Sequence, residues 1–310
     1  MTKYMIRRIV YMFITLFLIA SATFFLMKAL PGSPISSAPK LSPSQLAMVE
    51  AKYGLDEPVP VQYAKYMLNL AKGDLGNSFQ FKNASVTELI MNRLGPSVLI
   101  GTQGLILGVA IGILLGMIAA LRQNTVWDYG STLIAIIGIS IPSFVFATLL
   151  QYWLAVEWGL FPVGLWKDGW MSSILPSVAL AMGPLATASR FIRTEMIEVL
   201  SSDYITLAKS KGASGFEIAF KHAFRNALIP LVTVLGPLAA GLVTGSLVIE
   251  QIFAIPGIGE QFVKAITSND FSIIMGTTLF YSVLLIVIIF VVDVLYGIID
   301  PRIRLSGGSK

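Results

Sequence analysis

The sequence turns polar between two long apolar runs at residues 203–230, which read Asp203-Tyr-Ile-Thr-Leu-Ala-Lys-Ser-Lys-Gly212-Ala-Ser-Gly-Phe-Glu-Ile-Ala-Phe-Lys221-His-Ala-Phe-Arg225-Asn-Ala-Leu-Ile-Pro230. Good helix formers run from Tyr204 to Lys211. Gly212 is expected to stop that helix, because glycine readily takes the left-handed conformation of a C-terminal cap. A second helix is predicted for residues 213–224, and Pro230 is expected to mark the start of the next element. The two short helices would form an elbow that can fill a groove on a partner.

The composition indicates a membrane protein. Of 310 residues, 55% are hydrophobic and 13% are charged, whereas soluble domains typically have about 25% charged residues. The mean hydropathy is +0.77. The absence of cysteine excludes disulfides and thiolate metal sites, and a single histidine argues against a zinc cluster. Nucleic acid is not an expected partner, because the net charge of +5 is distributed by membrane side and does not form a basic face.

Apolar runs recur along the chain, and about 20 apolar residues suffice to cross a bilayer. The predicted crossings are residues 9–30, 98–121, 132–156, 174–192, 228–249 and 273–299. Helix-breaking residues are expected to bend or interrupt three of them, namely Gly138 with Pro142, Pro176 with Pro184, and Gly236 with Pro237. The expected fold is therefore an all-α membrane protein with six transmembrane helices.

The distribution of basic residues predicts which segments face the cytoplasm. Segments 1–8, 121–130, 190–226 and 300–310 together hold thirteen basic and six acidic residues, whereas 31–97, 157–173 and 250–272 hold eight and ten. Both termini and the elbow are therefore expected in the cytoplasm. The expected organisation is an N-terminal transmembrane helix (1–30), an extracytoplasmic lobe of two or three short helices (31–97), a transmembrane core (98–301) and a cytoplasmic tail (302–310). The lobe either docks a binding protein or covers the mouth.

Several residues inside the crossings have two interpretations. Gly104, Gly108, Gly112 and Gly116 recur every four residues and form a stripe that favours close helix packing over lining a pathway. Gln103 and Gln151 are expected to hydrogen-bond between helices, although either could meet a transported peptide. Asp293 is expected to pair with a cation near the inner face, and a functional role is the alternative. Glu250 could face a chamber or be an interfacial acid.

No catalytic arrangement is present in the sequence. A phosphate-binding P-loop needs a Gly-Lys pair, which this chain lacks. A nucleophilic triad could use only His222, which lies among lysines on the predicted cytoplasmic elbow. This chain is therefore not expected to be an enzyme or to hold a cofactor or metal of its own.

Residues 203–230 resemble the EAA loop of ABC-transporter membrane subunits. Ala208 and Gly212 occupy an alanine and the glycine of that pattern with the correct gap. Thr206, Leu207 and the segment 222–225 depart from the general pattern. They match the form seen in the peptide and nickel importer branch, Asp-Tyr-x-x-x-Ala-x-x-Lys-Gly … Arg-Asn-Ala-x-x-Pro. Further motifs of this branch are Leu30-Pro-Gly-Ser-Pro34, Gly73-Asp-Leu-Gly76, Phe253-Ala-Ile-Pro-Gly-Ile-Gly259 and Tyr296-Gly-Ile-Ile-Asp-Pro-Arg302.

The resemblance covers nearly the whole chain and implies a permease of the type I importer architecture in the cytoplasmic membrane of a prokaryote. The implied partners are a homologous second permease, two cytoplasmic ATPases that bind ATP and Mg²⁺, and an extracytoplasmic peptide-binding protein. Oligopeptides are the implied cargo, with dipeptides, nickel-chelates and glutathione left open. The implied ATPase-coupling residues are Tyr204, Ala208, Lys209, Ser210, Lys211, Gly212, Ala213, Ser214 and Phe216.

Functions of other classes would need other features. An ion-coupled carrier would be expected to have paired intramembrane carboxylates and an internal repeat, and the sequence offers only Asp293 inside a crossing. A structural anchor would need neither the glycine-rich crossings nor the elbow. An ordinary basic loop that follows the positive-inside rule is the simplest alternative interpretation of residues 203–230.

Overall fold

The computed structural model describes residues 2–29, 44, 47–48, 50–51, 54–81 and 84–299, with the side chains of residues 2–5, 229, 293 and 295–299 left out. Within these ranges the regular elements are helical, apart from an isolated bridge between Asn77 and Ser85. Five helices are long and apolar enough to cross a membrane, and a sixth crossing is possible if one bent helix pair counts as a span. The prediction of an all-α membrane protein is confirmed.

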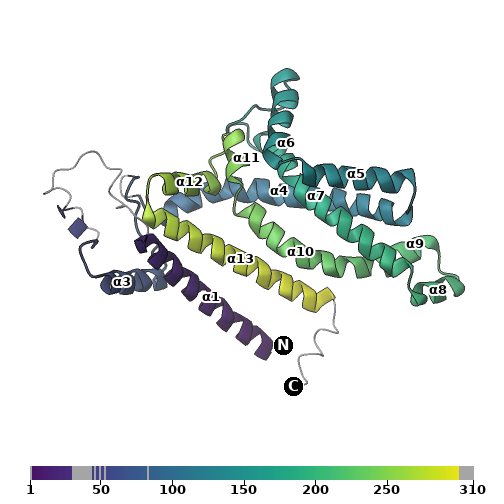
Figure 1. Cartoon of the computed structure of the whole chain (residues 1–310), viewed down its shortest axis with the longest axis horizontal. Coiled ribbons are helices and arrows are strands. Elements are labelled where there is room, and N and C mark those ends of the chain that lie inside the picture. Colours follow the sequence, from purple (N-terminus) through teal and green to yellow (C-terminus); the bar gives the residue numbers. More distant parts are fainter. Residues whose placement is uncertain are drawn as a thin grey trace. The chain divides into compact units, whose positions relative to one another are not determined.

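The chain divides into two compact units, residues 1–95 with 257–286 and residues 96–256 with 287–310. The first contains α1 (Thr2–Ala29), α3 (Val59–Ala71), α12 (Ile258–Thr267) and the first parts of α4 (Val86–Leu121) and α13 (Phe271–Ile299) (Figure 1). The second contains the rest of α4 and α13 with α5 (Val126–Ser140), α6 (Ser143–Leu150), η1 (Gln151–Glu157), α7 (Met171–Leu200), α8 (Asp203–Ser210), α9 (Gly215–Glu217), η2 (Ile218–Phe224), α10 (Arg225–Val243) and α11 (Leu247–Ile252).

In the first unit, α3 packs against α1 through aromatic rings and polar contacts. Phe24 lies 5.5 Å from Tyr66 and Phe25 lies 5.1 Å from Tyr63, measured between ring centroids. Lys28 donates a hydrogen bond to Gln62. These contacts fix the described part of the expected extracytoplasmic lobe to the first apolar helix. Residues 30–43 are outside the described residues, and so is the motif Leu30–Pro34.

The motif Gly73-Asp-Leu-Gly76 makes a tight turn that leads into α4. Gly73 and Gly76 have φ values of +79° and +81°, which favour glycine, and the Gly76 amide donates to Asp74 Oδ1 at 2.8 Å. The same segment is held by Asp270, which is fully buried and accepts hydrogen bonds from Ser78 Oγ and the amide of Ile273. The turn is therefore tied to the start of α13.

In the second unit, the glycine stripe of α4 packs directly on α7. A Cβ atom added to Gly108 would lie 2.3 Å from the Ala181 carbonyl oxygen, and one added to Gly112 would lie 2.4 Å from that of Leu185. Gly104 and Gly116 meet the carbonyl oxygens of Ser177 and Ser189 in the same way. The packing interpretation of the stripe is confirmed, because no side chain fits between these backbones.

Prolines interrupt the long helices less than the sequence predicts. Helix α7 runs unbroken from Met171 to Leu200 through Pro176 and Pro184, so the expected short, broken crossing at 174–192 is wrong. Helix α4 begins at Val86 and continues through Pro96. In tightly packed membrane helices, neighbouring groups re-satisfy the backbone that a proline leaves unpaired.

The third predicted crossing, 132–156, is a broken helix and not a kinked one. Helix α5 ends at Ser140, and the run Ser143–Glu157 leaves it at an angle of 102°. Ile141 and Pro142 are extended, with ψ values of 121° and 134°. The residue before a proline avoids the helical conformation, which accounts for the break at Ile141.

The fifth predicted crossing also breaks at a different place. Helix α10 runs through Pro230, Gly236 and Pro237, and the interruption follows at Thr244–Ser246, where Gly245 has φ +97°. Pro230 therefore lies inside a helix and does not begin one. Gly236 serves packing, because a Cβ atom there would lie 3.0 Å from Val292 Cγ2 of α13.

Candidate functional site

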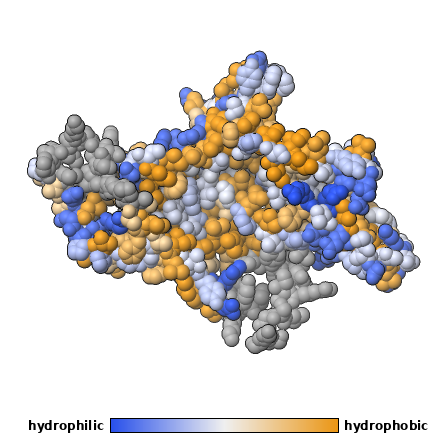
Figure 2. Space-filling view, viewed as in Figure 1, coloured by the Kyte–Doolittle hydropathy of each residue, from blue (hydrophilic) through white to orange (hydrophobic). Residues whose placement is uncertain are grey.

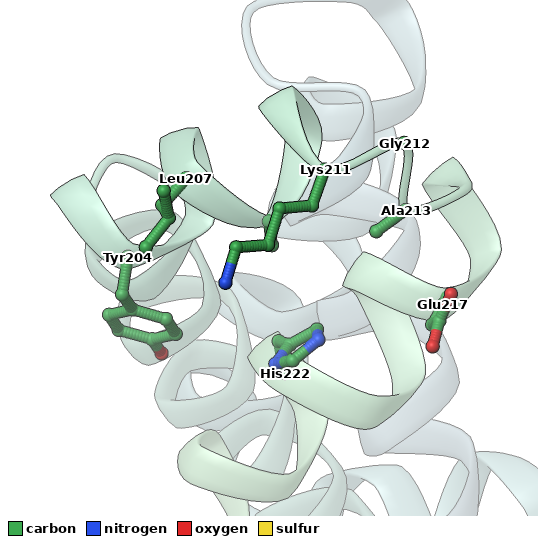
Figure 3. Close-up of a pocket in the computed structure, with 8 residues that line it drawn as sticks. Tyr204, Leu207, Lys211, Gly212, Ala213, Glu217 and His222 are labelled. Atoms are coloured by element: carbon green, nitrogen blue, oxygen red, sulfur yellow. The ribbon is translucent and has the colours of Figure 1, made fainter.

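The elbow predicted from residues 203–230 is present in the second unit. Helix α8 follows α7 after Ser201 and Ser202, and the chain reverses at Gly212 into α9, η2 and α10 (Figure 3). The expected first helix, 204–211, agrees with α8 to within one residue. The expected second helix, 213–224, does not stop at 224, because η2 continues directly into α10. Hydrophilic side chains gather at the end of the unit where α8 and α9 lie (Figure 2).

Gly212 ends α8 with a Schellman cap. Its φ is +85°, its amide donates to the Lys209 carbonyl at 2.9 Å, and the Ala213 amide donates to the Ala208 carbonyl at 3.1 Å. These two bonds satisfy carbonyls that a helix end otherwise leaves free. A Cβ atom on Gly212 would meet nothing within 4 Å, so the glycine is needed for its backbone angle and not for space.

The return helix has its own cap. Ser214 is extended, and its Oγ accepts a hydrogen bond from the Glu217 amide at 3.2 Å, which is the usual role of serine before a helix. The following turn, η2, is a π-helix. Such wide turns are uncommon inside helices and are frequent at functional sites.

Buried side chains and one hydrogen bond fasten the elbow to the rest of the unit. Ile205 of α8 is fully buried, and Ile218 and Ala219 of η2 are also buried. Asn226 Nδ2 donates a hydrogen bond to the Tyr204 hydroxyl at 2.8 Å, which joins the two ends of the elbow. The elbow is therefore a fixed structure with an anchored inner side.

The outer side of the elbow is exposed. Among the predicted coupling residues, Lys209, Ser210, Lys211, Gly212 and Ser214 are exposed, and Ala208 and Ala213 are half-buried. Tyr204 is 44% exposed and Phe216 is 73% exposed. Phe216 stacks on Phe220 with ring centroids 4.4 Å apart, which leaves a solvent-facing aromatic pair. The structure therefore brings all nine predicted coupling residues together on one element that a partner can reach.

An open groove of about 400 Å³ lies on the elbow between α8 and η2. We refer to it as the elbow pocket, and its walls are Tyr204, Leu207, Ala208, Lys211, Gly212, Ala213, Glu217 and His222. Figure 3 shows the Lys211 side chain extending from the end of α8 into the space above the His222 ring. His222, which the sequence suggests is an ordinary surface histidine, is half-buried in this wall.

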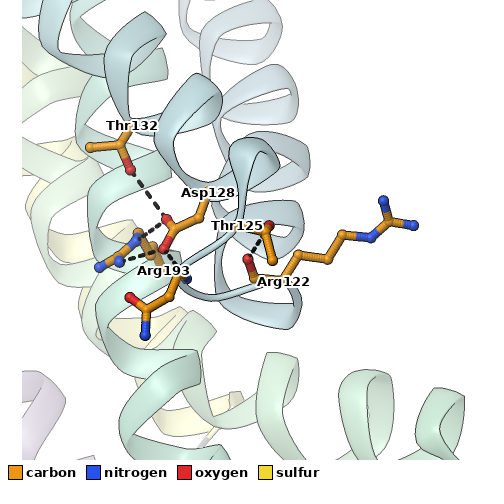
Figure 4. Close-up of polar contacts among 6 residues, drawn as sticks. Arg122, Thr125, Asp128, Thr132 and Arg193 are labelled. Carbon is orange, nitrogen blue, oxygen red and sulfur yellow. Dashed lines mark hydrogen bonds and ion pairs between the residues drawn. The ribbon is translucent and has the colours of Figure 1, made fainter.

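An ion pair between α5 and α7 is the main feature that the sequence did not predict. Asp128 Oδ1 accepts from Arg193 Nε at 2.6 Å, and Asp128 Oδ2 accepts from Arg193 Nη2 at 2.9 Å (Figure 4). The Asp128 side chain is 3% exposed and also accepts from the Asn124 amide at 2.9 Å. Sequence reasoning assigned residues 121–130 to a cytoplasmic segment and predicted no partner for Asp128. The available signal was an acid just before one apolar run and an arginine just after another.

The predicted intramembrane polar residues mostly join helices. Gln103 Oε1 accepts from Ser177 Oγ of α7 at 2.8 Å. Gln151 Nε2 donates to the carbonyl oxygens of Val163 at 2.6 Å and Ile252 at 2.9 Å. Both contacts support the helix-packing interpretation. The side chain of Asp293, on α13, is outside the described residues.

Glu250 is fully buried on α11. Its Oε1 accepts from Ser97 Oγ of α4 at 2.7 Å, so it is not the interfacial acid that its position in the sequence suggests. In the part of the chain that the structure describes, no three His, Asp or Glu side chains lie close enough to hold a metal ion.

Two family models together cover nearly the whole chain. Residues 112–305 match the model of the binding-protein-dependent transport system inner membrane component, and residues 1–100 match the corresponding N-terminal membrane component. The first match includes the complete elbow.

Curated relatives match from end to end. The chain is 48% identical to the dipeptide transport system permease protein DppB of Lactococcus lactis, over 98% of this chain and 100% of that protein. It is 45% identical to DppB of Bacillus subtilis, over 98% and 99%. It is 42% identical to the oligopeptide transport system permease protein OppB of Haemophilus influenzae, over 98% and 100%.

Solved structures share the fold at low identity. A MetNI methionine ABC transporter chain aligns with a TM-score of 0.54 and 18% identity, over 69% of this chain and 97% of that one. A chain of an amino acid ABC transporter with histidines aligns with a TM-score of 0.53 and 15% identity, over 68% and 94%. This multi-pass membrane protein therefore belongs to the family of inner-membrane components of binding-protein-dependent transport systems.

Proposed function

We propose that the chain is the membrane-spanning subunit of an ATP-driven importer of oligopeptides and that it performs no catalysis itself. The observation that carries this proposal is the elbow at Gly212, which is capped, anchored by Ile205 and exposed on its outer side. A separate motor can move a gate only through a rigid element within its reach. Family membership supports the general class, because these transport systems work with a binding protein.

The charge distribution favours a cytoplasmic position for the elbow and both termini. We expect two ATPase subunits there, which would bind ATP and Mg²⁺ and contact the predicted coupling residues around Gly212. A homologous second permease would complete the pathway in the bilayer. A peptide-binding protein would deliver cargo to the extracytoplasmic lobe, which includes the turn at Gly73–Gly76 and, just after it, Ser78 held by Asp270.

The elbow is continuous with the apolar helices α7 and α10, so a displacement of the elbow would be transmitted to both helices. Only Ser201 and Ser202 separate α8 from α7, and the return helix continues as α10. Closure of the ATPases on ATP would push α8, and α7 and α10 would move with it and open the cavity outward. Hydrolysis would reset the arrangement. The binding protein would recognise the peptide, and the permease would need only a wide, tolerant cavity.

Cysteine cross-linking tests the coupling contact. The chain has no cysteine, so Ser210→Cys and Ser214→Cys each introduce one reactive group on the exposed elbow. We expect both variants to cross-link to the ATPases in the assembled transporter. Ser268→Cys, after α12 in a segment predicted to lie outside, is the matched control and should not cross-link. Equal cross-linking of all three variants, or none from the elbow, would contradict the proposal.

Uptake into proteoliposomes tests the class of transporter. Peptide uptake should need ATP, the ATPases and the binding protein together. Uptake driven by an ion gradient without ATP would instead assign the chain to the secondary carriers.

Dipeptides are a second candidate cargo. The two DppB proteins are 48% and 45% identical to this chain, compared with 42% for the OppB protein. Competition in the same uptake assay by a dipeptide, a hexapeptide, a nickel-chelate and glutathione separates these cargoes. Oligopeptide import predicts that the hexapeptide competes, whereas competition by the dipeptide alone would favour the second candidate.

A further inference from the structure

The elbow presents an exposed outer side, and it also carries the elbow pocket. We propose that the elbow pocket receives an acidic side chain, with an apolar neighbour, from the ATPase that contacts the elbow. This inference rests on the proposed function, because it names the chemistry of the partner surface at the same site. The ATPase would then insert a side chain into the elbow pocket and also contact the outer side of the elbow.

The pocket has an excess of cationic and donor groups. Lys211 and His222 both line it, and neither makes an ion pair with a residue that the structure describes. Glu217 is the one carboxylate in the wall, and Lys221 already binds it at 3.0 Å. The charge of the pocket is therefore complementary to a carboxylate of the ATPase. Such a carboxylate can accept hydrogen bonds from the Lys211 ammonium group and a His222 ring N–H at the same time.

Part of the remaining wall is apolar. Leu207 is 56% exposed, and Ala208 and Ala213 are half-buried beside it. A volume of about 400 Å³ is more than a carboxylate needs. Removing apolar surface from water contributes roughly 25 cal/mol per Å². These walls therefore favour an occupant that places an apolar side chain beside its acid over a free inorganic anion.

The walls are held in place before any partner binds. The Gly212 cap fixes one end, the Ser214 cap fixes the start of the return helix, and the Tyr204–Asn226 hydrogen bond fixes the opposite end. A preformed site avoids the cost of ordering loops on binding. Contact on the outer side of the elbow would let the ATPase only push α8. A side chain inserted into the elbow pocket would also let the ATPase pull α8 back when its nucleotide is hydrolysed.

The test uses the complete transporter, reassembled from the membrane subunits in nanodiscs and the separate ATPases. Lys211→Met removes the charge and keeps most of the side-chain length, and it should weaken ATPase binding about tenfold. The affinity of this variant should also fall less steeply with added salt than that of the natural chain. Arg225→Met is the matched control, because Arg225 is exposed nearby but does not line the pocket, and it should bind within about twofold of the natural chain.

A charge reversal identifies the occupant. Lys211→Glu should abolish binding, and one Asp→Lys or Glu→Lys substitution in the ATPase should restore it. The proposal is overturned if Lys211→Met binds like the natural chain, or if Arg225→Met loses as much affinity, since general charge and not the pocket would then attract the partner. Cross-linking from Ser214→Cys, measured on the same samples, reports separately whether the elbow contacts the ATPase at all.

Discussion

The Asn226 side-chain amide donates a hydrogen bond to the Tyr204 hydroxyl at 2.8 Å, which joins the first turn of α8 to the first turn of α10. Both residues belong to the motif Asp-Tyr … Arg-Asn of this branch, so the two halves of the motif meet in space. The contact holds the first turn of α8, and the Gly212 cap closes its last turn.

Loss of this hydrogen bond should loosen α8 without unfolding the protein. Tyr204→Phe and Asn226→Ala should each destabilise the contact by about 0.5–1 kcal/mol. The measurement is amide hydrogen exchange, which should accelerate in residues 203–210 and stay unchanged in α7. Asn226→Asp is the control, because its carboxylate can accept from the tyrosine hydroxyl and should keep exchange slow. Unchanged exchange in Tyr204→Phe and Asn226→Ala would show that another contact holds α8.

The two elbow glycines should respond oppositely to alanine. Gly212 has φ +85° and Gly215 does not have a positive φ, while neither has any atom within 4 Å of an added Cβ. Gly212→Ala should lower stability by about 1–2 kcal/mol, because an alanine there must adopt the left-handed conformation. Gly215→Ala should be neutral or slightly stabilising, since alanine favours a helix. Thermal unfolding in detergent measures both, and equal effects would contradict the role of the cap.

The Asp128–Arg193 pair should be worth more than a surface ion pair, because the Asp128 side chain is 3% exposed. Asp128→Asn should destabilise the protein by about 2 kcal/mol, since it leaves a partly buried guanidinium without its charged partner. Arg193→Lys keeps the positive charge but loses the bidentate hydrogen bonding, so this variant should be less stable than the natural chain and more stable than Asp128→Asn. A double-mutant cycle with Arg193→Gln measures the coupling. A coupling energy near zero would mean that the two residues contribute independently.

The glycine stripe should tolerate no side chain. Gly108→Ala would place a Cβ atom 2.3 Å from the Ala181 carbonyl oxygen, so α4 and α7 must separate. Such overpacking typically costs about 1–3 kcal/mol. Gly183→Ala on α7 is the matched control, because nothing lies within 4 Å of its Cβ position. Gly108→Ala should unfold at a lower temperature than the natural chain and Gly183→Ala should not; the reverse order would contradict the packing described above.

Glu260, on α12 outside the apolar spans, should contribute stability that depends on pH. Burial alone would raise the pKa of this carboxyl, but Lys264 at 2.6 Å and Arg93 at 3.0 Å outweigh burial and leave the pKa below its ordinary value. The pKa is thus lower in the folded state than in the unfolded state. The resulting stability is present above about pH 4.3 and is lost as the pH falls through the folded-state value.

The measurement is the difference in unfolding temperature between the natural chain and Glu260→Gln from pH 7 to pH 3.5. This difference should stay constant down to about pH 4.5 and shrink below it. A constant difference over the whole range would show that the ion pairs of Glu260 contribute nothing. Glu88→Gln is a suitable control, because Glu88 forms none of the ion pairs described for this part of the chain.

The sequence predicted the elbow well because its signals are local. Gly212 and Ser214 act through hydrogen bonds to residues at most five positions away, so their effect can be inferred from neighbouring residues alone. The glycine stripe was also predictable, because a period of four residues places Gly104 to Gly116 on one face of a helix whatever its partner.

The misplaced helix breaks and the missed ion pair depend on distant contacts. Pro184 and Pro237 do not break their helices, although the local sequence favours a break, because packing in the second unit keeps those helices continuous. Asp128 and Arg193 lie 65 positions apart, and only the packing of α5 on α7 brings them together. A single sequence contains no signal for which of its crossings are neighbours.

Residues Gly215–Val243 form an unbroken helical run through α9, η2 and α10, roughly 40 Å long at 1.5 Å per residue. That length exceeds the roughly 30 Å of a hydrocarbon layer, so in the proposed coupling this run would extend from the ATPase side across the bilayer. A tilt of about 5° at the elbow would displace its far end by about 3–4 Å over this length. The far end is followed at once by Thr244–Ser246, where the chain leaves the helix. In the proposed coupling, this helical run would act as a lever arm that turns a small movement of the elbow into a larger displacement at residues 244–246.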